Sequence, residues 1–168
     1  RVAGFWMMGR VTLTPRIMSR QGALVKGEWR QRLESGSYSI AASGIYQLDK
    51  DYFLDKFKDP NYPSYRDFRG TVETRGRFAL TDKWSWGWDG IMPTDPLYYS
   101  DYGLSSYQRT YSPLATGFTE GISQLYLLGD GNRSFFDARS IYYYGFSSAD
   151  SQSQIPIIHP VVDYFHTF

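Results

Sequence analysis

The sequence has no cysteine among its 168 residues, which excludes disulfides and thiolate metal ligands within this stretch. Neither sign of charge dominates: the net charge is +1, so composition offers no reason to expect nucleic acid as a partner. No apolar run approaches the roughly 18 residues of a membrane-spanning helix. The chain also starts without methionine or a signal-peptide pattern. We therefore expect an internal or processed piece of a longer protein.

Motifs of enzyme chemistry are equally scarce. There is no Gly-x-Ser-x-Gly nucleophile elbow and no phosphate-binding loop. The two histidines, His159 and His166, would fall on opposite faces of a strand and cannot clamp one metal ion. Asp49 and Asp51 stand beside lysines, which favours a solvated loop over acid–base catalysis. We expect no enzyme, no cofactor and no metal site.

The chain is rich in aromatic residues and in alternating patterns. Aromatic residues make up 18% of it, with 15 Tyr, 11 Phe and 5 Trp. From Met8 to Leu33, two stretches alternate apolar and polar residues around a turn at 19–22, as strands with one apolar face do. Similar patterns cover 36–48, 67–81, 84–89, 118–128 and 134–146, with a weaker one at 104–111 and a last strand starting at Val161. Residues 49–66 and 93–103 read as long loops, the first with room for a short helix over 52–57.

Together these patterns predict an all-β fold, an antiparallel up-and-down meander. Alternation does not separate a soluble β-sandwich from an outer-membrane β-barrel, because both have one apolar face. Three features favour the barrel: long strands, connections that alternate short and long, and aromatic residues near the strand ends. Arginine facing lipid at mid-bilayer costs about 2–4 kcal/mol, so the arginines of 67–81 are predicted to face the lumen. The alternatives are another porin-like barrel and a soluble β-sandwich that binds carbohydrate through its tryptophans.

Pro15 is the odd residue of the first strand. Proline has no N–H, removes a rung from the ladder it faces, and is normally confined to sheet edges or bulges. A well-patterned strand weakened at its centre is either an edge or a seam that opens. We therefore expect residues 1–168 to be a partial domain, one arc of a large transmembrane outer-membrane β-barrel, without its remaining strands or a periplasmic domain.

Three stretches resemble the barrel of the lipopolysaccharide-assembly family LptD, the organic solvent tolerance proteins. The first is LTPRIMSRQGALVKGEWRQRL followed by ESGSYSIAASG, which resembles the start of that barrel in its Thr-Pro, its Gln-Gly turn and its Glu-Trp-Arg. The others are SDYGLSSYQRT and the proline-flanked QIPIIHPVVDYF. The order and spacing of the three stretches carry the resemblance, which covers essentially the whole chain apart from the two long loops.

The resemblance implies a function and a set of partners. It implies a translocon of the cell outer membrane that inserts lipopolysaccharide into the outer leaflet through a lateral gate between the first and last strands. Expected partners are lipopolysaccharide, outer-membrane lipids, an LptE-type plug lipoprotein inside the barrel, and an LptA-type periplasmic bridge protein reached through a domain not present here. Pro15 matches the family's second-strand proline, whereas the first-strand proline has no counterpart. The implied gate residues are Val11, Leu13, Pro15 and Ile17.

A basic face offers candidate contacts for the phosphates of an anionic glycolipid or for the plug lipoprotein, because guanidinium groups bind phosphate in a bidentate manner. The candidates are Arg10, Arg16, Arg30, Arg69, Arg75 and Arg77, with Lys26 and Arg32 on the same face. The alternative is a hydrated lumen wall whose arginines are neutralised by carboxylates: Glu28, Glu34, Glu73 and Asp89.

Overall fold

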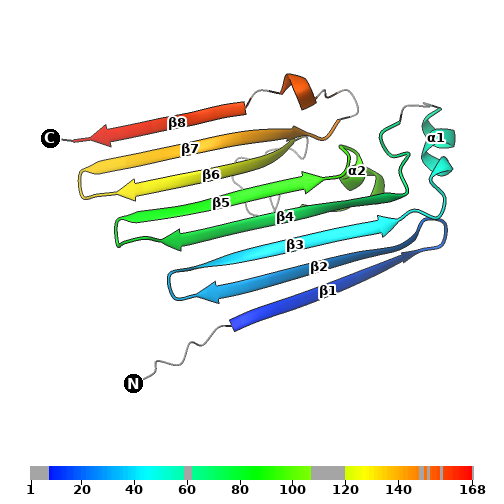
Figure 1. The fold of residues 1–168 in the computed structure, drawn as a ribbon, viewed down its shortest axis with the longest axis horizontal. Coiled ribbons are helices and arrows are strands. Elements are labelled where there is room, and N and C mark those ends of the chain that lie inside the picture. The colour runs from blue at the N-terminus through cyan, green and yellow to red at the C-terminus, as the bar shows by residue number, and fades with distance from the viewer. Residues whose placement is uncertain are drawn as a thin grey trace.

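A single antiparallel sheet forms the body of the structure, a computed structural model that describes residues 8–58, 62–106, 120–147, 150, 152–155 and 157–167. Its eight strands lie in sequence order, so each pairs only with its neighbours along the chain (Figure 1). They are β1 (Met8–Met18), β2 (Gly22–Leu33), β3 (Gly36–Tyr46), β4 (Phe68–Ala79), β5 (Trp84–Pro93), β6 (Glu120–Asp130), β7 (Ser134–Gly145) and β8 (Ile157–His166). The predicted meander is confirmed, and its single layer fits an arc of a barrel better than a two-sheet sandwich.

The connections distinguish the two ends of this sheet. Short turns join β2 to β3, β4 to β5 and β6 to β7 at one end, called here the turn end, where β1 begins and β8 finishes (Figure 1). The opposite end, called the loop end, carries helices α1 (Asp51–Phe57) and α2 (Tyr98–Tyr102) and the short 3-10 helix η1 (Gln152–Gln154). In outer-membrane barrels the short turns face the periplasm and the long loops face the outside.

Two predictions about the long connections need correction. The sequence predicts a loop over 93–103, but β5 reaches Pro93 and α2 follows it. The predicted strand at 104–111 is wrong for residues 104–106, and its other residues lie outside the described part. The short helix expected over 52–57 is confirmed as α1. Across the described residues, neither helix is long or apolar enough to cross a membrane.

Strand β8 begins at Ile157, earlier than the predicted start at Val161. Its pairing with β7 shifts between Arg139 and Ile141, next to Pro160. Proline lacks the N–H that the ladder needs, so the strand passes this point through an irregularity and then resumes its pairing. A proline that marks a strand boundary in the sequence pattern therefore lies inside a strand in the structure.

The two faces of the sheet have different surroundings. On one, called the outer face, large apolar side chains remain uncovered: Leu13 is 70% exposed, Ile17 86% and Met92 75%. Such exposure along a whole sheet is unusual for a protein surrounded by water and is expected where strands face lipid. On the opposite, inner face, Arg69 and Glu73 of β4 are buried. The charged residues of β4 thus lie on the side predicted for them.

A row of aromatic rings crosses the outer face near the turn end. Trp86 and Trp88 of β5 stack on Phe78 of β4, with ring centroids 5.5 and 5.8 Å away. Trp88 also covers Gly76, where an added Cβ would come within 2.3 Å of the indole ring. Its Nε1 donates a hydrogen bond to Thr74 Oγ1 at 3.1 Å. Aromatic girdles of this kind mark the lipid–water interface of outer-membrane barrels, and the row fits that position.

Candidate functional site

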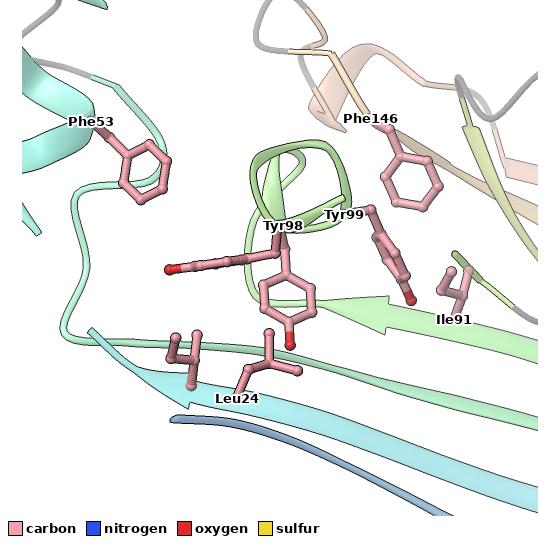
Figure 2. Close-up of a cluster of buried hydrophobic side chains, with 8 residues drawn as sticks. Leu24, Phe53, Ile91, Tyr98, Tyr99 and Phe146 are labelled. Atoms are coloured by element: carbon pink, nitrogen blue, oxygen red, sulfur yellow. The ribbon is translucent and has the colours of Figure 1, made fainter. Parts of the chain in front are cut away.

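A cap covers the inner face at the loop end. Helix α2 buries Tyr98, Tyr99 and Tyr102 against the sheet, and Phe53 of α1 joins them (Figure 2). The rest of this cluster is Leu24, Ile45, Ile91 and Phe146. The hydrophobic core among the described residues therefore lies on the face that carries the charges, because the apolar face has no protein layer over it.

Arg69 of β4 joins the cap to the sheet. Its Nε and Nη2 donate to the two carboxylate oxygens of Asp95 at 2.8 and 2.6 Å, and both side chains are fully buried. Its Nη1 lies 3.0 Å from Asp101 Oδ2, close enough for an ion pair although not aligned as a hydrogen bond. The rings of Phe53 and Tyr102 lie 5.3 and 5.2 Å from the guanidinium carbon. One cation thus connects β4, both helices and the loop before α2.

Tyrosine hydroxyls add a second buried network. Tyr99 Oη donates to Glu73 Oε1 at 2.8 Å, and Ser106 Oγ donates to Glu73 Oε2 at 2.7 Å. Tyr102 Oη donates to Gln47 Oε1 at 2.6 Å. Buried tyrosines need such partners for their hydroxyl groups, and these partners come from β4 and from the loop after β3. The cap is therefore held in one position by polar contacts as well as by ring packing.

The cap should respond to alkaline pH. Burial raises the pKa of Tyr102 to about 12, and burial followed by the Glu73 charge raises the pKa of Tyr99. A released tyrosine ionises near pH 10. The neutral hydroxyls therefore stabilise the docked cap fully below about pH 10, and this stabilisation is lost as the pH rises through about 12.

Difference titration of tyrosinate absorbance checks this prediction in the complete protein. Subtracting the Tyr102→Phe curve from the wild-type curve should show a component that ionises at about pH 12. The same subtraction with Tyr65→Phe, which removes a tyrosine that is 43% exposed in the loop before β4, provides the reference. A Tyr102 component with its midpoint at pH 10 would contradict the buried position of this side chain.

The arginines proposed as phosphate contacts lie in three places. Four of them line one hollow of about 350 Å³ on the inner face near the turn end: Arg10, Arg30, Arg75 and Arg77. Arg32 lines the same hollow. Arg16 lies elsewhere, and its Nη1 donates to the backbone oxygen of Tyr102 at 2.6 Å. Arg69 is enclosed in the cap with two aspartates and is therefore not accessible to a phosphate group.

The predicted gate residues all lie on β1, which has β2 as its only partner among the described strands. Val11, Leu13, Pro15 and Ile17 are all exposed. The pairing of β1 with β2 runs from Met8 to Met18 without a shift, and Pro15 stands opposite Val25. The structure thus places these four residues together on an edge strand of the described sheet.

The sequence patterns do not predict helix α2 or the burial of its tyrosines. Signals for α2 exist: Asp95 Oδ1 accepts a hydrogen bond from the backbone N–H of Leu97 at 3.1 Å, and Gly103 ends the helix with a φ of 58°. An Asp-Pro pair followed by a glycine would therefore have marked a single helical turn. No local signal indicates that this turn folds back onto β4.

Comparison with known proteins assigns the family. The model of the family described as LPS transport system D, LptD, matches residues 67–167. This range includes β4 to β8, Arg69 and the cap helix α2, whereas Pro15 and the rest of β1 to β3 precede it. No curated protein matches the chain. The matched family is a transport and assembly family of the Gram-negative outer membrane and is not an enzyme family. Since the match covers more than half of the chain and agrees with the eight-stranded meander, the chain belongs to the LptD family of lipopolysaccharide-transport proteins.

Proposed function

We propose that the protein inserts lipopolysaccharide into the outer leaflet of the outer membrane through a lateral gate formed by β1. Membership of the family supports lipopolysaccharide as the cargo and favours it over the solutes of a general porin. The observation that supports the gate is the uncovered apolar side of β1, where Val11, Leu13 and Ile17 are 59%, 70% and 86% exposed. A strand that carries a proline and is apolar towards lipid suits a seam through which a lipid passes sideways.

Pro15 would weaken this seam. Proline is tolerated in edge strands where its missing N–H faces away from the neighbouring strand. The uninterrupted register of β1 with β2 across Pro15 supports that orientation. The free edge of β1 then offers one hydrogen-bond donor fewer to the strand beside it at the seam, which lowers the stability of the closed seam by about 0.5–1.5 kcal/mol.

Pro15→Ala in the complete protein should therefore slow export. Restoring one donor lowers the open population of the gate roughly two- to tenfold. The measurement is photo-crosslinking in cells, with a probe placed in turn at each position from Val11 to Met18. Lipopolysaccharide adducts should cluster around Pro15 in the parent protein, and their yield should fall in the Pro15→Ala variant.

Pro160→Ala, which changes a proline in β8, is the matched control. Unchanged adducts and unchanged surface lipopolysaccharide in Pro15→Ala would refute the role of this proline, and adducts with phospholipid alone would refute the gate.

The partners follow from the same proposal. An LptE-type plug lipoprotein would occupy the lumen, and an LptA-type bridge protein would deliver cargo from the periplasm through a further domain. The inner face supports a partner at the turn end, because the cap covers the loop end while the arginine-lined hollow stays open. Outer-membrane lipids would contact the uncovered apolar side chains of the outer face.

A further inference from the structure

Strand pairing brings the arginines of the inner face into two rows near the turn end. In the first row, Arg10 of β1 stands opposite Arg30 of β2, which stands opposite Ser39 of β3. Ser39 in turn stands opposite Arg75 of β4, whose Nε donates to the serine Oγ at 3.2 Å. This row therefore carries three guanidinium groups across four adjacent strands.

The second row repeats this order one pleat further along. Arg32 of β2 stands opposite Ser37 of β3, and Ser37 stands opposite Arg77 of β4. Because adjacent strands are about 4.8 Å apart, the two arginine-bearing strands are roughly 10 Å apart across a floor of small serine side chains. We call this hollow the arginine trough and define it by Arg10, Arg30, Arg32, Ser37, Ser39, Arg75 and Arg77.

The carboxylates expected on this face do not balance the trough. Glu28 accepts two hydrogen bonds from Arg30, at 2.5 and 2.8 Å, and so balances one arginine. Asp89 lines the trough, stands directly opposite Arg75 and accepts a hydrogen bond from Gln124 at 2.7 Å. Glu73 is held inside the cap by Tyr99 and Ser106, and Glu34 does not line the trough. The five arginines therefore outnumber the two carboxylates, which leaves the trough positive.

This excess charge favours an anion in the trough. Arg10 and Arg30 stand directly opposite each other on paired strands, where like charges repel, and Glu28 balances only one of the two. An anion between the arginine-bearing strands would remove that repulsion. Guanidinium groups match phosphate oxygens in a bidentate manner, and the serine floor leaves room for a tetrahedral group with hydroxyl donors beneath it. A phosphoryl group therefore fits the shape and the charge of the trough.

We propose that the arginine trough binds phosphoryl groups of the glycolipid cargo at the periplasmic end of the inner face. The proposal rests on the proposed function for the source of the phosphoryl group. It adds a coupling to the gate, because Arg10 belongs to β1 while the other arginines belong to β2 and β4. A phosphoryl group in the trough would bridge the gate strand to the wall beside it.

Equilibrium binding to the purified complete protein in detergent tests this site with three probes. They are lipopolysaccharide, the same lipopolysaccharide after enzymatic removal of its phosphates, and inorganic pyrophosphate. Arg32→Gln with Arg77→Gln removes one guanidinium from each side of the trough. Lys83→Gln with Arg133→Gln is the matched control, since both cations are exposed and lie in turns at the same end, outside the trough.

The trough variant should raise the dissociation constant for lipopolysaccharide roughly tenfold or more, because it removes charge-assisted hydrogen bonds. The control should change it less than about twofold, in line with screened surface charges. Dephosphorylated lipopolysaccharide should bind the parent and the trough variant equally weakly. Equal thermal midpoints for both variants would show that the sheet is intact.

Three results would overturn the proposal. If the trough variant and the control variant lost the same affinity for lipopolysaccharide, the effect would come from net charge and not from the trough. Loss of pyrophosphate binding with unchanged lipopolysaccharide affinity would assign the trough to free phosphate. A photo-probe at Ser37 that captures a protein instead of lipopolysaccharide would assign it to an acidic partner. The trough and the gate can fail independently. If lipopolysaccharide forms adducts on β1 but binds the trough variant with unchanged affinity, the trough alone is refuted. If lipopolysaccharide binding depends on its phosphates but no adducts form on β1, the gate alone is refuted.

Discussion

Arg69→Met is expected to release the cap from the inner face. The substitution leaves the carboxylates of Asp95 and Asp101 buried without their cation, and breaking a buried ion pair in this way costs about 3–5 kcal/mol. Such a loss raises the open population of the cap roughly 100-fold or more. Long loops of outer-membrane barrels face the outside, so chymotrypsin added to intact cells should then cut after Tyr98, Tyr99 and Tyr102, which are buried in the parent protein.

Two further variants separate the buried ion pair from a general loss of charge. Arg66→Met removes an exposed arginine from the loop just before β4, where its Nε donates to Pro63 O at 3.2 Å, and should leave cleavage unchanged. Arg69→Met combined with Asp95→Asn and Asp101→Asn should recover part of the protection, because no unpaired charge stays buried. Equal cleavage of the Arg69 and Arg66 variants would show that Arg69 does not hold the cap.

Tyr99→Ala should lower the free energy of unfolding by about 3–5 kcal/mol, the usual cost of deleting a buried aromatic ring. Tyr99 is 3% exposed, and its ring centroid lies 5.4 Å from that of Phe146. Tyr99→Phe keeps the ring and removes only the hydroxyl that donates to Glu73, so it should cost about 1–3 kcal/mol. Thermal unfolding in detergent and the hydrogen exchange of α2 measure both effects.

Tyr46→Ala provides the control for this pair, because Tyr46 is 65% exposed and its removal leaves no cavity. If Tyr99→Ala cost no more than Tyr46→Ala, the ring would not be part of a packed core. If Tyr99→Phe cost as much as Tyr99→Ala, the bond to Glu73 would outweigh the packing. Hydrogen exchange confined to α2 and residues 104–106 would show that the cap opens while the sheet stays paired.

Strand order and the two faces of the sheet were predictable from the sequence. Side chains alternate across a strand, so apolar and polar residues at a spacing of two predict which share a face. On β4 this alternation correctly placed Phe68 and Val72 opposite Arg69 and Glu73. The resemblance in the sequence also identified the family, which the comparison then confirmed over residues 67–167. The structure does not test the role of Pro15, which stays a prediction.

Only the tertiary structure decided what covers each part of the inner face. Arg69 and Arg75 have the same residue type, strand and face, and the sequence pattern treats them alike. Arg69 is fully buried against Asp95, which lies 26 positions further along the chain, whereas Arg75 lines the open trough. The difference arises because the loop after β5 folds back over the loop end of the sheet and does not reach the turn end. Alternation reports only neighbours along one strand, so it contains no information about a contact that a distant loop makes with that strand.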